Sequence, residues 1–324
     1  MRILVTGGAG FIGSHTIDEL LARGHEPIAF DNLSTGSKNN LTHNIPLIVG
    51  DIRDEKLLRE LFSDLKPERV CHLAAQMSVS RSVRDPAFDA DVNVVGLLRV
   101  LECCRDFNVD RIVFASSGGA LYGDVTKPAK ETDACEPGAP YGISKWVGER
   151  YLQYFAEEFG LQSFSLRYAN VYGPRQNPLG EAGVVAIFST QMLDGKSVTI
   201  NGDGKYVRDY VYVTDVARAN ADVLEAEAGE PFLALNVGTE IGTDVNQLAS
   251  SIQTLCKKAR EERGQTAPIP PAEHGPARPG DLRTSMVSHE SLSQRFGWLP
   301  EISLNKGLQW TVHWFSNTKN NHSQ

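Results

Sequence analysis

The chain has 324 residues, of which 41% are hydrophobic and 22% are charged, a composition typical of a globular protein. Its formal net charge is −8 at pH 7. This acidic balance argues against nucleic acid or an anionic membrane surface as the main partner, because both call for a basic patch. No stretch of the sequence approaches the roughly 20 apolar residues needed to cross a bilayer.

The sequence also gives no sign of secretion or of a metal site. It starts directly with an apolar segment and lacks the basic region, apolar run and cleavage site of a signal peptide. The five cysteines are scattered without a Cys-x-x-Cys pair, and the eight histidines show no metal-ligand spacing. We therefore expect a cytoplasmic protein without a bound metal.

Short apolar runs alternate with amphipathic stretches through the first half of the chain. The predicted strands are Ile3–Thr6, Pro27–Phe30, Leu47–Val49, Val70–Leu73, Ile112–Ala115 and Ser163–Leu166. The predicted helices are Phe11–Arg23, Lys56–Leu65, Ala90–Phe107 and Tyr141–Phe159. Apolar strands separated by helices indicate a parallel sheet covered on both faces. The predicted fold class is therefore α/β, with a Rossmann-like doubly wound parallel sheet.

Beyond about Leu166 the loops become richer in glycine and proline, which predicts a smaller C-terminal α/β substrate-binding region. Its predicted helices are 183–193, 214–226, 245–262, 289–296 and 304–316, and its strands include 197–200, 209–213 and 233–237. We assign residues 1–170 to the nucleotide-binding domain. Residues 171–318 form the smaller region, intertwined with the first, and 319–324 form a polar tail.

A glycine motif follows the first predicted strand and opens the first predicted helix, with Gly7, Gly10 and Gly13 spaced three apart. Glycine lets such a turn close and lets backbone N–H groups approach a pyrophosphate. Asp31 ends the second strand about twenty residues later, where an acid binds the adenosine ribose 2′-hydroxyl. The carboxylate would repel a 2′-phosphate, so the motif predicts NAD rather than NADP. A tight glycine turn without a ligand is the alternative.

Tyr141 and Lys145 are four residues apart on a predicted helix and therefore share one face. A nearby ammonium should lower the pKa of the phenol and make it a usable general base. Beside a nicotinamide, the phenol can take a hydroxyl proton while hydride leaves the same carbon. A surface helix with a chance Tyr and Lys is the alternative, and the upstream glycine motif favours catalysis.

Further polar and small residues stand where predicted strands end, the edge at which such sheets bind nucleotides. Ala74 and Ala75 permit close approach of a cofactor, and Asn93 on the next helix can form local hydrogen bonds. The segment that follows the fifth strand, Ser116–Gly123, can present a hydroxyl to Tyr141. Simple turn or packing chemistry is the alternative for each of these segments.

Several segments, in order over nearly the whole chain, carry a specific resemblance. They are Thr6–Gly13, Asp31–Gly36, Gly50–Ile52, His72–Gln76, Tyr141–Lys145, Leu166–Gly173, Arg208–Val211 and Arg278–Asp281. By these segments the chain resembles an extended short-chain dehydrogenase/reductase of the NAD-dependent epimerase/dehydratase family. Within that family it is most similar to the UDP-glucose 4-epimerases.

The resemblance implies an NAD-dependent nucleotide-sugar epimerase in which Tyr141 is the acid/base, Lys145 orients it and Ser117 supplies a hydroxyl. The cofactor-binding residues that it implies are Gly7, Gly10, Phe11, Ile12, Gly13, Asp31, Asn32, Ser34, Thr35, Gly36, Asp51, Ile52, Leu73, Ala74, Ala75, Gln76, Asn93, Ser116, Tyr141, Lys145 and Tyr168. The implied UDP-sugar contacts are Ser117, Tyr141, Asn170, Val184, Thr199, Arg208, Arg278 and Asp281. Asn170 and the two arginines would hold the phosphates, with Asp281 near the uridine; for each arginine alone, a surface salt bridge is the alternative.

Three positions refine this expectation. Gly118 stands where the family normally carries a catalytic Ser or Thr, so Ser117 or Ser116 has to supply that hydroxyl. Gly119 and Ala120 replace the acid that dehydratases and decarboxylases carry, which favours epimerisation at C4 over elimination. Ser285, where some relatives carry a bulky Tyr, leaves room for a 2-N-acetyl group.

The expected reaction is therefore 4-epimerisation of UDP-glucose and UDP-galactose with retained NAD, and of UDP-GlcNAc and UDP-GalNAc if Ser285 opens the pocket. The alternatives are a UDP-glucuronate epimerase or decarboxylase, a keto-sugar reductase, or a non-catalytic NAD-binding scaffold. The resemblance also suggests a homodimer formed through the apolar faces of Ala90–Phe107 and Tyr141–Phe159.

Overall fold

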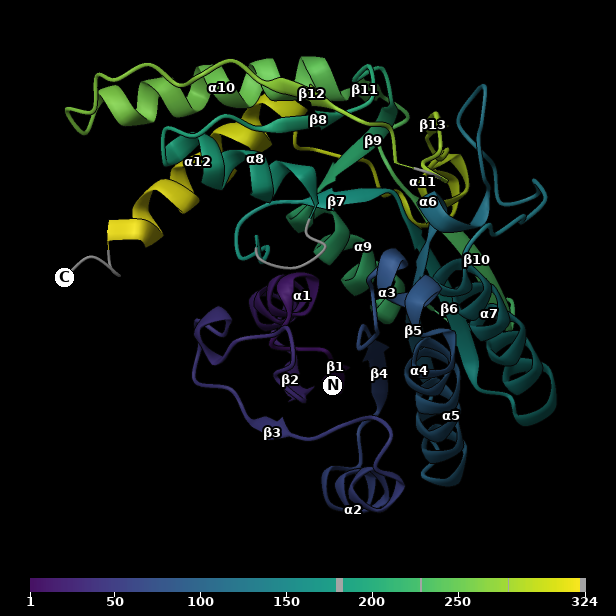
Figure 1. Cartoon of the computed structure of the whole chain (residues 1–324). Coiled ribbons are helices and arrows are strands. Elements are labelled where there is room, and N and C mark those ends of the chain that lie inside the picture. The colour runs from purple at the N-terminus through teal and green to yellow at the C-terminus, as the bar shows by residue number, and fades with distance from the viewer. Residues whose placement is uncertain (179–182, 228, 279, 321–324) are drawn as a thin grey trace.

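The computed structural model describes residues 1–178, 183–227, 229–278 and 280–320. A seven-stranded sheet, in which every adjacent pair of strands is parallel, lies in the lower part of Figure 1. Its order is β10-β6-β5-β4-β1-β2-β3, so the direction of winding switches between β1 and β4. This confirms the predicted doubly wound sheet. The strands are β1 (Arg2–Thr6), β2 (Glu26–Asp31), β3 (Leu47–Val49), β4 (Arg69–His72), β5 (Arg111–Ser117), β6 (Gln162–Tyr168) and β10 (Phe232–Val237).

Both faces of the large sheet are buried, which explains why its strands read as nearly continuous apolar runs. Along β1, Ile3 and Val5 pack into the core on one face and Leu4 into the core on the other. The first face is covered by α1 (Phe11–Ala22) and α9 (Val213–Glu225), and the second by α2 (Glu55–Leu65), α5 (Gly96–Asp106) and α7 (Pro140–Phe159).

A smaller region lies above the large sheet in Figure 1, on the side where β5 leads into α6 (Gly118–Leu121). In it β9 pairs with β11, β13 and β7, and β8 pairs with β12. Its strands are β7 (Asn170–Tyr172), β8 (Thr199–Asn201), β9 (Val207–Tyr212), β11 (Gly242–Asp244), β12 (Glu273–Gly275) and β13 (Thr284–Ser285). Its helices are α8 (Val184–Leu193), α10 (Val245–Glu261) and α12 (Leu304–Asn320), whereas α11 (Glu290–Phe296) packs against the large sheet. Among the described residues, no helix is both long and apolar enough to span a lipid bilayer.

The helix predicted over Ala90–Phe107 begins earlier than predicted, at Pro86, and contains a π-helical turn that the sequence analysis did not predict. The structure has α4 (Pro86–Ala90), a π-helical turn η2 (Asp91–Val95) and then α5. At this π turn the Asn93 side chain bonds the backbone of Gln76 in both directions, at 2.8 Å each way. The sequence analysis also missed several elements of two to six residues, which are too short to show a period: β7, β11, β12, β13, α3 (Val79–Arg84), α6 and the 3₁₀ turn η1 (Lys38–Asn40).

The division of the chain at residue 170 stays a prediction. β10 lies far beyond that position yet forms an edge strand of the large sheet, and α9 packs on the same sheet. At the other end, α12 continues to Asn320, and the remainder of the predicted polar tail, 321–324, lies outside the described residues.

A buried ion pair fastens α7 to the large sheet. Arg167 of β6 donates to both carboxylate oxygens of Glu149 on α7, at 2.9 and 2.6 Å. The hydroxyls of Ser116 and Ser165 donate to the same carboxylate at 2.7 and 2.8 Å. Glu149 is completely buried and Arg167 nearly so, so the charges depend on each other for compensation.

We expect Arg167→Met to cost about 3–5 kcal/mol in the free energy of unfolding, because it leaves the Glu149 carboxylate buried and unpaired. Arg295→Met is the matched control, since Arg295 pairs with Glu230 at the exposed surface, and it should cost less than about 1 kcal/mol. Denaturant unfolding of both variants makes the comparison. Equal losses would show that burial of the pair is not what makes it important.

Candidate active site

The glycine turn between β1 and α1 is shaped for close approach of backbone to a ligand. A Cβ on Gly13 would lie 2.1 Å from the carbonyl oxygen of Gly7, so a side chain cannot fit there. Gly7 itself has φ +69° and lies against the backbone of Ala74, where a Cβ would be 2.8 Å from the amide nitrogen. Within the described residues, no side chain caps α1 and no acid stands in its first turn. Its first-turn N–H groups, which include those of Phe11 and Ile12, can therefore serve an anionic phosphate.

Asp31 lies at the carboxyl end of β2 beside this turn. Its carboxylate accepts hydrogen bonds from the backbone N–H groups of Ala9, at 3.0 Å, and Leu33, at 2.8 Å. Burial raises the pKa of Asp31, and these hydrogen bonds oppose the rise. Gly36 packs against both Ala9 and the Asp31 carboxylate, because a Cβ there would lie 2.9 Å from each. The carboxylate is thus held in one orientation next to the glycine turn.

The other predicted cofactor residues extend along the same edge of the sheet. Asn32 donates to Asp51 at 2.9 Å, and bonds from Arg53 hold the pKa of Asp51 well below its usual range. The amide of Ala74 donates to the Thr6 hydroxyl at 3.3 Å. The remaining residues of this predicted set occupy the loops that follow β2, β3 and β4, the π turn η2 or the last residues of β5: Ser34, Thr35, Ile52, Leu73, Ala75, Gln76, Asn93 and Ser116.

The side chain of Tyr168, which was predicted to lie near the cofactor, is directed into the core instead. Its ring is buried in the core on the α1 and α9 face, and its hydroxyl donates to Asn220 at 2.7 Å. Only the backbone of Tyr168 can therefore face a ligand. The alternation of side chains along β6 directs this one into the core.

Tyr141 and Lys145 lie on the first turns of α7, as predicted, and face the end of β5. The Lys145 ammonium is nearly fully buried and donates to the carbonyl of Ala115 at 2.8 Å. It lies 5.8 Å from the centroid of the Tyr141 ring. The Tyr141 side chain forms a hydrogen bond with that of Ser117. A phenol, a hydroxyl and an ammonium from three chain positions thus converge at the carboxyl edge of the sheet.

The expected effect of Lys145 on the phenol is not found. Burial raises the pKa of Tyr141 to about 12; the Ser117 hydrogen bond lowers it and the charge of Asp89 adds to the rise. Burial lowers the pKa of Lys145 to about 8, against the charges of Asp89 and Glu149. The simple helical-face argument fails because desolvation outweighs an ammonium that is already bonded to a backbone carbonyl.

A side chain at position 118 would point into the packed interior beside Val287. A Cβ at this position would lie 2.5 Å from Val287 Cγ1 and 3.3 Å from the Arg167 carbonyl, so a serine here would push into packed side chains. Ser117 occupies the position beside the phenol instead. A Cβ on the next residue, Gly119, would lie 3.5 Å from Ser285 Oγ, which brings Ser285 to the loop that follows β5.

Two predicted substrate residues, Asn170 and Arg208, lie with Ser285 in the four-stranded sheet of the smaller region, called the small sheet below. Asn170 begins β7, and its buried Nδ2 has no hydrogen-bond partner within the described part of the chain. Arg208 lies on β9, and Ser285 of β13 is its register partner. The others are more peripheral: Val184 begins α8, Thr199 begins β8, and Arg278 and Asp281 are exposed in the segment between β12 and β13.

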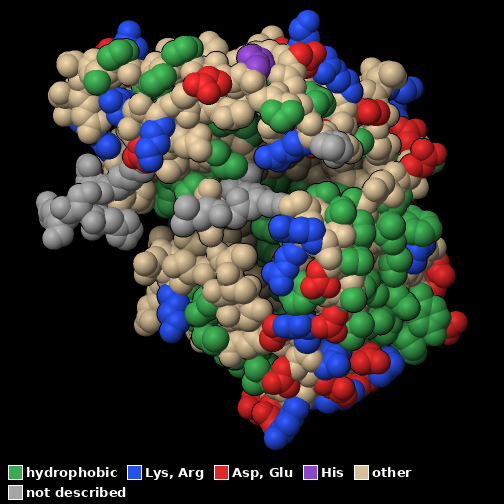
Figure 2. Space-filling view, in the orientation of Figure 1, with side chains coloured by type: hydrophobic (Ala, Val, Ile, Leu, Met, Phe, Trp, Pro, Cys, Tyr) green, Lys and Arg blue, Asp and Glu red, His purple; other side chains and the backbone are tan. Residues whose placement is uncertain are grey.

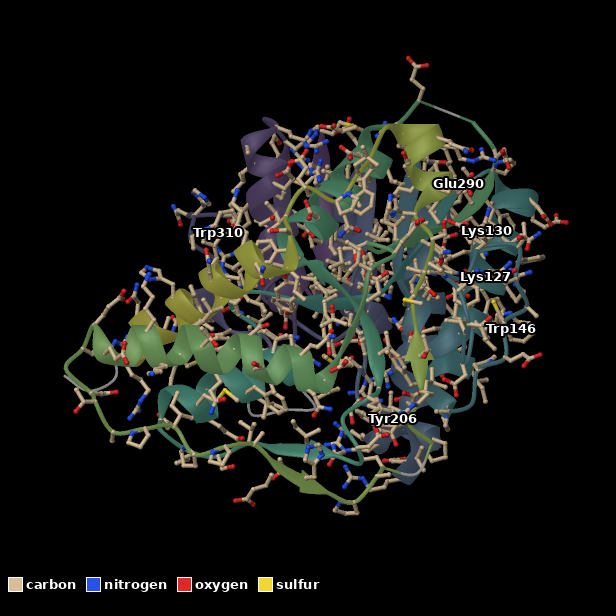
Figure 3. The ribbon with its side chains drawn as sticks, turned by 90° about the horizontal axis from the view of Figure 1, so that it is seen from above. Lys127, Lys130, Trp146, Tyr206, Glu290 and Trp310 are labelled. Atoms are coloured by element: carbon tan, nitrogen blue, oxygen red, sulfur yellow. The ribbon has the colours of Figure 1, made fainter. Side chains whose placement is uncertain are left out.

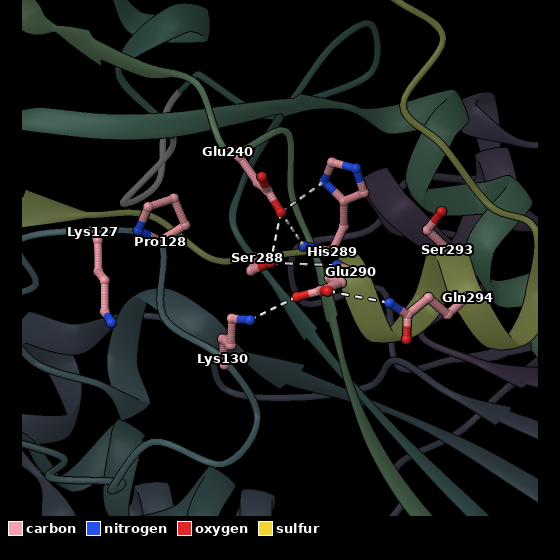
Figure 4. A pocket seen from close by; sticks show the side chains of 9 residues that line it. All are labelled: Lys127, Pro128, Lys130, Glu240, Ser288, His289, Glu290, Ser293 and Gln294. Carbon is pink, nitrogen blue, oxygen red and sulfur yellow. Dashed lines mark hydrogen bonds and ion pairs between the residues drawn. The ribbon is translucent and has the colours of Figure 1, made fainter.

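A surface pocket of about 510 Å³ lies at the start of α11, and none of the predicted catalytic residues lines it (Figure 4). Lys130 is paired with Glu290 at 2.7 Å, and Ser288 donates to Glu240 at 2.6 Å. These pairs satisfy much of the charge in the pocket, so it is a poor candidate for a diphosphate. The converging groups around Tyr141 remain the better candidate.

The sequence analysis missed Asp89 of α4 and Ser144 of α7. Asp89 is fully buried and accepts hydrogen bonds from Gln76, Asn93 and Ser144. One signal was available, because Asp89 stands four residues before Asn93 and so shares its helical face. Ser144, next to Lys145, gave no comparable signal.

Comparisons with known proteins identify the family. The model of the NAD dependent epimerase/dehydratase family matches residues 3–238. A putative UDP-glucose 4-epimerase of Methanocaldococcus jannaschii is 43% identical over 317 residues, covering 97% of this chain and 98% of that protein. The structure of a UDP-glucose 4-epimerase from Thermotoga maritima with UDP-glucose is 47% identical with a TM-score of 0.90, covering 98% and 100% of the two chains. The enzyme of the same name from Thermus thermophilus, in complex with NAD, is 43% identical with a TM-score of 0.89, covering 97% and 99%.

The chain therefore belongs to the NAD-dependent epimerase/dehydratase family. This confirms the predictions of the family, of an NAD-dependent enzyme and of NAD as the cofactor.

We expect Gly118→Ala to lower the thermal midpoint of unfolding, because its Cβ would overlap Val287 Cγ1. Gly138→Ala is the matched control, since nothing lies within 4 Å of a Cβ at that position, and its midpoint should stay unchanged or rise slightly. Calorimetry or circular dichroism measures both. A Gly118→Ala variant as stable as the control would contradict the inward orientation of residue 118.

Proposed function

We propose that this protein is a UDP-sugar 4-epimerase that interconverts UDP-glucose and UDP-galactose with retained NAD. The observation that carries the proposal is the hydrogen bond between Tyr141 and Ser117, with Lys145 buried one helical turn away. This constellation stands at the carboxyl edge of a parallel sheet, beside a turn that excludes side chains. The UDP-sugar epimerases among the related structures support the same assignment.

The residues at the sheet edge fit NAD. The turn around Gly7 and Gly13 would hold the pyrophosphate, because any Cβ there meets backbone atoms at under 3 Å. The fixed Asp31 carboxylate would hold the adenosine ribose, as its acceptor oxygens suit a hydroxyl and repel a phosphate. When bound, NAD supplies a hydride acceptor and a positively charged ring that favours ionisation of a neighbouring phenol.

Tyr141 would take the proton of the sugar 4-hydroxyl and later return it to the same C4 oxygen, after the sugar has turned its other face to the site. Ser117 holds the phenol oxygen through its hydrogen bond, so the proton moves along a defined path. Because burial dominates the pKa of the phenol, we assign Lys145 an orienting role through the bond from its ammonium to the Ala115 carbonyl. The same residues serve both directions of transfer, as a reaction without net oxidation requires.

Epimerisation also needs an anchor that lets the sugar turn over. We assign that role to the UDP end, with Asn170 and Arg208 on neighbouring strands and Arg278 from the segment after β12. Guanidinium groups suit diphosphate oxygens, and the unpartnered Asn170 amide can donate to them. Val184, Thr199 and Asp281 complete the proposed UDP site.

The residues around the proposed sugar position favour epimerisation, and they leave space for a larger sugar. Gly119 and Ala120 provide no second acid for elimination, and the small Ser285 side chain lies next to Gly119. We therefore include UDP-GlcNAc and UDP-GalNAc among the proposed substrates. We also propose the cytoplasm as the location; the five cysteines are free thiols in the structure.

We expect Tyr141→Phe to lower the turnover of UDP-galactose to UDP-glucose by about 10²–10⁴-fold, because the proton acceptor is lost. Tyr151→Phe is the control, since Tyr151 is an exposed residue of the same helix. Anion-exchange chromatography of the products, without added cofactor, measures the rate. Near-normal turnover by Tyr141→Phe would refute the assignment, and consumption of stoichiometric cofactor would favour a keto-sugar reductase.

We further propose a homodimer that pairs the faces of α5 and α7. Exposed apolar side chains gather on this surface, among them Val95, Ile143, Trp146 and Tyr154. Figure 2 shows hydrophobic side chains concentrated on the face of the molecule where α7 lies. An apolar surface of this kind on a protein with a mixed, acidic exterior marks an association site.

We expect Trp146→Glu to convert the dimer to monomer, because it buries a charge at the proposed interface. Trp310→Glu is the control: Trp310 is similarly exposed, at 42% against 39%, but lies on the opposite side of the molecule (Figure 3). Analytical ultracentrifugation gives the masses. A dimer that survives Trp146→Glu but not Trp310→Glu would place the interface elsewhere.

A further inference from the structure

A second buried carboxylate lies close to the candidate catalytic residues. Asp89 on α4 is completely buried. One of its oxygens accepts hydrogen bonds from the side-chain amides of Gln76, at 2.7 Å, and Asn93, at 3.1 Å. The other accepts a bond from the hydroxyl of Ser144 at 2.7 Å. All three partners are neutral, and no ion pair recorded for the described residues includes Asp89.

This carboxylate contrasts with Glu149, the other buried acid near Lys145. Glu149 is neutralised by two hydrogen bonds from the Arg167 guanidinium. Asp89 has neutral donors only, so its negative charge remains uncompensated in an interior where charges act strongly. A buried charge without a partner is costly, which suggests that it has a use.

The hydrogen bonds of Asp89 connect three elements of the active site whose relative positions matter. Gln76 lies in the loop that follows β4, Asn93 lies in the π turn η2, and Ser144 directly precedes Lys145 on α7. Gln76 also bonds the backbone of Ser78, at 2.9 Å, and α3 meets α7 where Ser82 accepts a bond from the amide of Tyr141 at 3.1 Å. One carboxylate thus links the cofactor side of the site to the turn that carries the ammonium.

The charge of Asp89 reaches both catalytic groups. It raises the pKa of Lys145 and that of Tyr141. The other ionisable groups around the ammonium are Glu149, which is paired with Arg167, and His72 of β4, whose pKa falls to about 3 through burial and the charge of Lys145. Asp91 of η2 faces outward in an ion pair with Arg53. Asp89 is therefore the unpaired anion in this surrounding.

We propose that Asp89 is a positioning residue of the active site, whose buried carboxylate fixes the Lys145 turn of α7 and keeps the Lys145 ammonium charged during the reaction. The proposal rests on the proposed epimerase function for its kinetic test. The hydrogen bonds of Asp89 with Ser144 and Asn93 hold the Lys145 turn in place, and the charge of Asp89 acts on the ammonium through space. The role differs from that of Glu149, which holds α7 to the sheet without leaving a net charge.

Asp89→Asn separates charge from shape. The amide oxygen can still accept the bonds from Gln76 and Asn93, and the new NH₂ group can donate to the Ser144 hydroxyl, which turns to donate to the carbonyl one helical turn earlier. The same three partners stay bonded to residue 89, with the Ser144 bond reversed, while the negative charge is lost. If this variant does not fold, Asp89→Ser, which also removes the charge, takes its place.

The kinetic test is the pH profile of kcat with UDP-galactose. Activity requires an ionised Tyr141 and a protonated Lys145, and Asp89 raises the pKa of both groups. Removing its charge should therefore move the acidic and the alkaline limits of the profile to lower pH, by about one unit or more. Ser144→Ala is the matched control: it removes one hydrogen bond from the same carboxylate and keeps the charge, so its limits should stay where they are.

A measurement without turnover distinguishes failure of this proposal from failure of the epimerase assignment. The folded-state pKa of Lys145 is about 8, below the ordinary value of 10.5. The unfolded chain therefore binds more protons between these values, and the Lys145 contribution to the free energy of unfolding rises with pH above about 8. Without the Asp89 charge, this rise should begin at lower pH, and it should vanish in Lys145→Met.

The outcomes are distinct. The proposal is supported if two quantities move to lower pH in Asp89→Asn but not in Ser144→Ala. They are the limits of the kcat profile and the pH at which the free energy of unfolding begins to rise. A variant that loses activity with unchanged limits and an unchanged onset shows that Asp89 is structural only, which overturns it. If the wild type does not epimerise UDP-galactose, the epimerase proposal fails, and the unfolding measurement alone decides the role of Asp89.

Discussion

The buried ammonium of Lys145 is the constraint on which the rest of the site depends. A charge that is nearly removed from water needs polar partners in fixed places. Lys145 finds a carbonyl at the end of β5, the field of Asp89 from α4, and that of Glu149 one turn further along α7. Because these partners belong to different elements, satisfying them sets how α7 meets the sheet. That placement also sets where Tyr141 meets Ser117.

The two parts of the molecule divide the proposed reaction between them. The edge of the large sheet brings together the glycine turn, Asp31 and the Tyr141 phenol, so it can hold a cofactor and move a proton. The small sheet carries Asn170, Arg208 and Ser285 on adjacent strands, where a diphosphate can be held while the sugar changes its face. The loop after β5 connects these functions, because Gly119 meets Ser285 and Ser117 meets Tyr141.

Features with a local cause could be predicted from the sequence. The glycine spacing, Asp31 at a strand end and the four-residue step from Tyr141 to Lys145 follow from the geometry of single elements. The π turn at Asn93 could not be predicted, because the contact made there is with the backbone of Gln76 in a separate loop. The orientation of Gly118 depends on Val287, far away in sequence. The sign of the pKa shift of Tyr141 depends on burial, which no pattern in the chain reports.

The most direct test follows the hydrogen at C4 of the sugar. The protein is incubated with UDP-galactose that carries deuterium at C4, without added cofactor, and the products are analysed by NMR and mass spectrometry. Transient oxidation with retained NAD predicts UDP-glucose that keeps the deuterium at C4, with no reduced cofactor accumulating. Loss of the label to solvent, or oxidation products matched by stoichiometric reduced cofactor, would contradict the account.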